Sequence, residues 1–89
     1  MKFVAERQGN EIFLKAGDSR GESVHQLSAS ECADLLSCVE AALDGSDNEH
    51  ISRSGGTFKL KLQVSDRCSQ VYYVNERKLV ELRIQLMGV

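Results

Sequence analysis

The alternation of apolar and polar side chains in residues 58–64 constrains the fold more than any other feature of this chain. A strand points successive side chains to opposite faces of its sheet, so strict alternation predicts a strand with one buried face and one face in water. The apolar positions are Phe58, Leu60, Leu62 and Val64, and the polar positions are Lys59, Lys61 and Gln63. We therefore expect a sheet that packs on the core through one face and presents lysine side chains on the other.

Two more segments are predicted to complete this sheet. Residues 65–69 form a turn cluster, and residues 70–74 return as a strand rich in valine and tyrosine. Residues 80–86 alternate once more and predict a last strand, although Leu79 and Met87 leave a helix open. Residues 45–56 are polar and lack a period, which predicts one long loop.

The first half of the chain begins with a predicted hairpin of residues 2–8 and 11–16. Gly9 and Asn10 separate the two segments, and both residue types tolerate the positive φ of a two-residue hairpin turn. The register pairs Ala5 with Leu14 and Arg7 with Ile12, which places Phe3, Ala5, Ile12 and Leu14 on the core face. Residues 22–27 predict a third, weaker strand.

One amphipathic helix is predicted over residues 29–44. Ser28 and Glu31 have the spacing of a capping box, in which the serine hydroxyl and the glutamate carboxylate each accept from the other residue's backbone amide. Gly45 supplies the stop. The apolar stripe consists of Cys32, Leu35, Leu36, Val39 and Leu43. This stripe is narrow and one-sided, so the helix is expected to lie on a sheet with its acidic back in water.

These elements predict an α+β fold with the order βββ-α-βββ, in which a mostly antiparallel sheet carries a single amphipathic helix on one face. A chain of 89 residues without proline is expected to form a single domain over residues 1–89. No apolar run approaches the roughly 20 residues that a membrane span needs. An odd number of cysteines, without a signal-like segment, indicates a reducing cytoplasmic environment.

Charge is distributed unevenly along the chain. Residues 1–49 carry four basic and ten acidic side chains, whereas residues 50–89 carry seven basic and three acidic ones. The halves therefore have charges of −6 and +4, within a net charge of −2. Such polarity allows the halves to attract each other, within one chain or across a dimer, or lets the basic half face an acidic partner.

The candidate binding residues follow from the predicted second-half sheet. Its outer face is expected to carry Lys59, Lys61 and Arg83 together with either Tyr72 or Tyr73. Cations beside an aromatic ring resemble, in chemistry alone, the platforms that bind single-stranded nucleic acid. The same surface suits a protein partner, to which an outward Phe13 adds an apolar anchor. Polar residues are also routine on the wet face of an antiparallel sheet.

No pattern in the sequence predicts a catalytic, metal or cofactor site. The cysteines and histidines lack the paired spacing of metal ligands, so neither a metal nor a cofactor is expected. His25 would act as a base only beside a nucleophile or carboxylate, and Cys68 would gain reactivity only from a positive neighbour such as Arg67.

The sequence thus favours a small non-enzymatic interaction module of the regulator, inhibitor or adaptor type, which binds another protein or itself as a homodimer. The alternative is a single-stranded nucleic-acid-binding protein that uses the basic outer face of the second-half sheet.

Overall fold

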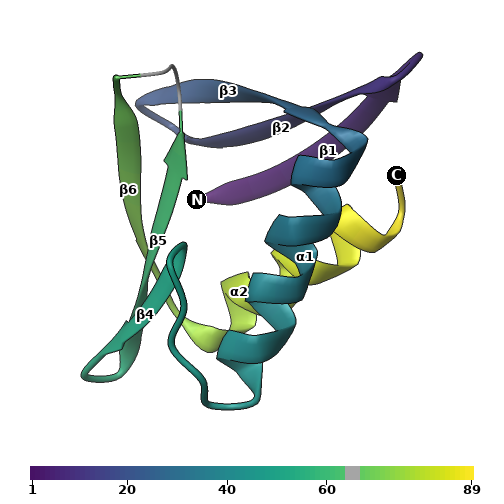
Figure 1. The fold of residues 1–89 in the computed structure, drawn as a ribbon. Helices are drawn as coiled ribbons and strands as arrows, with labels where there is room; N and C mark the ends of the chain where they lie inside the picture. Colours follow the sequence, from purple (N-terminus) through teal and green to yellow (C-terminus); the bar gives the residue numbers. More distant parts are fainter. Residues whose placement is uncertain (64–66) are drawn as a thin grey trace.

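Two three-stranded antiparallel sheets and two helices make up the structure, a computed structural model that describes residues 1–63 and 67–89 (Figure 1). The elements are β1 (Lys2–Gln8), β2 (Glu11–Asp18), β3 (Gly21–Ser28), α1 (Ala29–Leu43), β4 (Ile51–Ser54), β5 (Thr57–Gln63), β6 (Ser69–Val74) and α2 (Glu76–Met87). The predicted α+β class and antiparallel pairing are confirmed. The order is βββ-α-βββ-α, so the single predicted helix is one too few, and the strands form two separate sheets instead of the one sheet that was predicted.

The first half folds as its sequence predicts. Strands β1 and β2 form the expected hairpin, with Ala5 opposite Leu14, and Gly9 adopts a φ of 63° in the turn. The third strand is β3, slightly longer than expected. The capping box starts α1: the Glu31 amide donates to Ser28 Oγ at 3.1 Å, and the Ser28 amide donates to Glu31 Oε1 at 3.0 Å.

The predicted strand over residues 80–86 is wrong, because this segment belongs to helix α2. Leu79, Leu82 and Leu86 are all buried, and their spacing follows the helical period. Leu82 and Leu86 also satisfy a period of two, but a strand would bury Val80 and Ile84 beside them, and both of these residues are exposed. Asn75 caps the helix, since its Oδ1 accepts from the Lys78 amide at 2.9 Å.

The predicted loop over residues 45–56 is corrected as well, because its second half contains β4 and the turn into β5. Gly55 has a φ of 61° in this turn, and Ile51 pairs with Leu60 across the two strands. Four residues are too few for the alternation to stand out in the sequence. The expectations for Val64 and for the first two residues of the 65–69 turn lie outside the described residues.

The two halves repeat one βββα unit. Leu14 pairs with His25 in the first half as Leu60 pairs with Tyr72 in the second, and the turns carry Gly9 and Gly55 in the same left-handed conformation. His25 and Tyr72 each stand three residues before the cap of the following helix. We call residues at matching places in these registers equivalent. The repeat was not visible in the sequence because the matched side chains differ.

The helices pack against each other in the angle between the two sheets (Figure 1). Each helix also contacts the first strand of the other half: α2 packs on β1, and α1 packs on β4. The Ala5 amide of β1 donates to the Gln85 side chain of α2 at 3.0 Å. One shared core results, and its largest fully buried side chains are Phe3, Leu14, His25, Val39, Ile51, Leu60, Leu79 and Leu82.

Candidate functional site

The outer face of the β4–β5–β6 sheet brings together two lysines and two apolar side chains. In the register of β5 and β6, Lys59 lies opposite Tyr73 and Lys61 lies opposite Val71. All four residues are exposed, and Tyr73 retains 64 % of its accessible surface. We call these four residues the basic sheet face. A tyrosine and a valine on β6 thus stand opposite two lysines on β5.

The electrostatics of this face differ from those of the equivalent face on the first sheet. Lys15, the equivalent of Lys61, has its ammonium 3.4 Å from the Glu6 carboxylate on the neighbouring strand. In contrast, no ion pair engages Lys59 or Lys61 within residues 1–63 and 67–89. Among the described residues the charges of Lys59 and Lys61 are therefore uncompensated, whereas that of Lys15 is paired with a carboxylate.

A hollow of about 380 Å³ opens beside Lys61, at the margin of the basic sheet face. The described residues that line it are Glu49, His50, Lys61, Gln63, Arg67, Cys68 and Ser69. Two cations, Lys61 and Arg67, outnumber the one carboxylate of Glu49 in this lining, and the amide and hydroxyl of Gln63 and Ser69 add hydrogen-bonding groups. The hollow thus suits a carboxylate or another small anionic group better than an apolar side chain.

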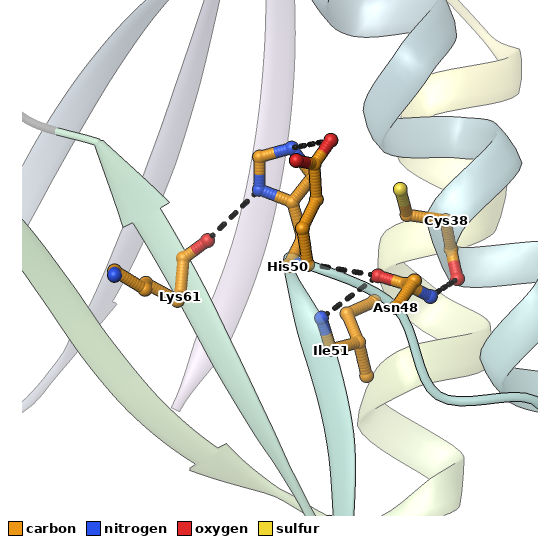
Figure 2. A network of polar contacts seen from close by, with 6 residues as sticks. Cys38, Asn48, His50, Ile51 and Lys61 are labelled. Carbon is orange, nitrogen blue, oxygen red and sulfur yellow. Dashed lines mark hydrogen bonds and ion pairs between the residues drawn. The ribbon is translucent and has the colours of Figure 1, made fainter.

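The side chain of Asn48 holds the segment before β4 beside this hollow (Figure 2). Its amide group donates to the Cys38 carbonyl oxygen at 2.9 Å, and its Oδ1 accepts from the amides of His50 and Ile51 at 3.0 and 2.9 Å. One asparagine thereby ties helix α1 to the start of β4. The backbone of His50 is in consequence fixed at the edge of the basic sheet face.

Cys68 and His50 line the same hollow, so the structure brings a thiol and an imidazole to one surface. The ring of His50 is occupied by other contacts: Nδ1 lies 3.4 Å from the Lys61 carbonyl oxygen, and Nε2 lies 3.8 Å from the Glu49 carboxylate (Figure 2). Within the described residues, no hydrogen bond joins either ring nitrogen to the Cys68 thiol. This arrangement resembles a surface cluster more than a nucleophile with its base.

The structure places the other sequence-predicted residues elsewhere. Arg83 lies on α2, with its Nε 3.8 Å from the Glu40 carboxylate of α1, so the expectation that it shares a face with the lysines is wrong. That expectation depended on a strand where the chain forms a helix. Tyr72 is buried, and Phe13 is half-buried on the outer face of the first sheet. Of the two tyrosines, Tyr73 is therefore the outward one.

Tyr72 instead links the two sheets inside the core. Its hydroxyl lies 2.8 Å from Nε2 of His25, whose Nδ1 lies 3.4 Å from the Gln63 carbonyl oxygen. A carbonyl oxygen only accepts, so the neutral imidazole carries its proton on Nδ1 and Nε2 accepts from the tyrosine hydroxyl. Burial lowers the pKa of His25, and the contact with Gln63 offsets part of this effect. His25 is 1 % exposed and therefore contacts no external ligand in this fold.

Two contributors to the site were missed in the sequence. Val71 alternates with Tyr73 in the segment 70–74, so its place on the outer face was open to prediction. His50 gave no comparable signal, because its position depends on the contacts of Asn48. A separate apolar surface was also missed, because helix α2 was not predicted. Val80, Ile84 and Met87 form an exposed apolar stripe on this helix, with 37–59 % of their surface accessible.

Within residues 1–63 and 67–89, no group of three or more histidine, cysteine or acidic side chains is arranged to hold a metal ion. None of the described helices is long and apolar enough to cross a membrane. Comparison of the chain with protein-family models, with curated proteins and with solved structures found no match.

Proposed function

We propose that this chain is a small non-enzymatic interaction module that binds an acidic segment of another protein on the basic sheet face. The observation that carries the proposal is the juxtaposition of exposed Tyr73 with Lys59 and Lys61, two cations without an ion-pair partner among the described residues. Tyrosine is enriched at the energetic centres of interfaces, and lysines at their margin steer acidic partners. A regulator, inhibitor or adaptor would need no more than such a surface.

The histidines support a binding function over a catalytic one, and the cysteines support a cytoplasmic location. The imidazole of His25 is sealed in the core, and that of His50 is engaged by its neighbours. Cys32, Cys38 and Cys68 are all unpaired thiols, which suits a reducing compartment.

The test is a selection of random peptides displayed on phage against the full chain. We expect the enriched peptides to be rich in aspartate and glutamate and to include apolar residues. Binding of a selected peptide should weaken at least tenfold in Lys61→Glu, since a favourable contact becomes repulsive. Tyr73→Ala should weaken it by a similar factor, because the ring is the largest exposed apolar group on the face.

The repeated architecture provides matched controls for both variants. Lys15→Glu makes the same change of charge at the equivalent position of the first sheet, and Gln26→Ala truncates the equivalent of Tyr73. Both controls should keep the peptide affinity within about twofold. Enriched peptides without acidic residues, or equal losses in Lys15→Glu and Lys61→Glu, would show that the basic sheet face is not the binding site.

Single-stranded nucleic acid is the second candidate ligand, favoured by the position of Lys59 directly opposite Tyr73. A base stacked on the ring would place its phosphate beside the ammonium groups. Binding of oligo(dT) through two lysines should follow the logarithm of salt concentration with a slope of about −1.4. This slope should flatten in Lys59→Glu/Lys61→Glu, and an affinity that ignores both salt and these substitutions would remove the candidate.

A second copy of the chain remains the other protein partner, as a homodimer. The exposed stripe of Val80, Ile84 and Met87 is the surface where such a contact would bury apolar area. Sedimentation velocity over a hundredfold range of protein concentration tests this. A sedimentation coefficient that rises with concentration, and returns to the monomer value in Ile84→Glu, is the expected result for a dimer.

A further inference from the structure

We propose that the acidic segment binds as an additional strand on the free edge of β6, with its acidic side chains over the basic sheet face. The inference deepens the proposed function and depends on it. Strand β6 ends its sheet, and within the described residues no strand pairs with its second edge. An unpaired edge presents backbone N–H and C=O groups that an extended peptide can match.

The composition of β6 sets it apart from the other edge strands. Proteins commonly protect such edges with charged residues, with very short strands or with covering elements. Strand β1 has its edge contacted by α2, whose Gln85 accepts from the Ala5 amide. Strand β3 contains Glu22, and β4 has only four residues. Strand β6, with the sequence SQVYYV, contains no charged residue and is rich in strand-forming side chains.

Charge complementarity indicates the kind of strand that would fit. A peptide paired with β6 would lie two strand spacings from β5, about 10 Å. Glutamate side chains of the peptide and the side chains of Lys59 and Lys61 are long enough to meet over this distance, above the side chains of Val71 and Tyr73 on β6. Side chains on one face of a strand recur every second residue, as Lys59 and Lys61 do on β5. We therefore infer a partner segment with acidic residues at alternate positions and apolar residues between them.

The test uses the full chain and a short synthetic peptide of alternating glutamate and valine with blocked ends. Two derivatives carry backbone N-methyl groups, one on the glutamate amides and one on the valine amides. Only one set of amides can face β6 in a paired strand, because successive amides point to opposite sides. Fluorescence anisotropy should show binding of the parent peptide, a loss of at least tenfold for one derivative and a change within twofold for the other.

The outcomes separate this inference from the proposed function. If Lys61→Glu weakens the parent peptide but both methylated derivatives bind equally well or equally poorly, the peptide binds on the face without strand pairing and the inference is overturned alone. If Lys61→Glu and its control Lys15→Glu have equal effects, the proposed function fails, whatever the methylation shows.

A second measurement checks the edge directly. Hydrogen exchange followed by NMR should show alternate amides of β6 becoming protected when the parent peptide is added, because only the amides that point away from β5 gain a partner. Unchanged exchange along Ser69–Val74 would overturn the inference. Peptide affinity that falls as protein concentration rises would also overturn it, since the edge would then pair with a second copy of the chain.

Discussion

Replacement of Tyr72 by phenylalanine tests the buried link between the two sheets. The substitution removes only the hydroxyl that lies 2.8 Å from Nε2 of His25 and keeps the aromatic ring, which packs edge-on against Phe3 at a centroid distance of 6.3 Å. Nε2 is then left as a buried acceptor without a donor. Such a group costs about 1–3 kcal/mol of folding free energy. For a domain of this size that loss lowers Tm by roughly 5–20 °C.

A double-mutant cycle isolates the interaction from the packing. His25→Leu removes the acceptor, and the combination with Tyr72→Phe replaces the polar pair by apolar groups of similar shape. A pair replaced together is expected to lose less than the sum of its single losses, here by about 1 kcal/mol or more. Urea unfolding followed by circular dichroism measures the free energy of unfolding of all four proteins.

The neighbouring residue supplies the control. Tyr73→Phe removes the same hydroxyl from an exposed ring on the same strand, and its effect should stay within about 0.5 kcal/mol. If Tyr72→Phe is as mild as Tyr73→Phe, or if the two single losses simply add, the hydrogen bond does not contribute to stability and the reasoning fails.

The lowered pKa of His25 means that the unfolded chain takes up a proton more readily than the folded chain. The contribution of His25 to the free energy of unfolding should therefore be constant above pH 6.5 and fall as pH drops from 6.5 toward the lowered value. A pH series of urea titrations below pH 6.5 measures this fall, which should be smaller in His25→Leu; an unchanged fall would contradict the assignment. Exposed Cys68 should react with a thiol reagent at neutral pH well before Cys32 and Cys38, because burial raises the pKa of both latter thiols; mass spectrometry of labelled peptides gives the order, and equal rates would contradict it. Ser28→Ala should lower the free energy of unfolding by about 1 kcal/mol, whereas Ser28→Asn should restore most of it, as measured by denaturant titration.

The first half of the fold was predictable because each of its signals is local. The turn at Gly9 and Asn10 sets the register of β1 and β2, and the capping box of Ser28 and Glu31 starts α1 at the expected residue. In each case neighbouring residues settle the structure through backbone geometry or a short hydrogen bond.

The second half depends more on distant contacts, which explains the errors there. Leucines at positions 82 and 86 fit both a strand and a helix, and the choice is made where α2 packs on α1 and on β1. Strand β4 exists because it pairs with β5 and because Asn48 holds its start. Lys59, Lys61 and Tyr73 lie on one face as local alternation predicts. Arg83 does not join them, because its segment forms a helix instead of the predicted strand.

The packing of each helix on the opposite half of the chain has a consequence for the order of folding. Helix α2 packs on β1 and helix α1 packs on β4. The hydrogen bond from the Ala5 amide to the Gln85 side chain joins residues that are 80 positions apart in the sequence. Contacts of such high sequence separation form late, since a long loop must close before they yield any stabilisation. The edge of β1 that α2 covers in the folded chain is therefore expected to stay exposed during folding until α2 packs against it.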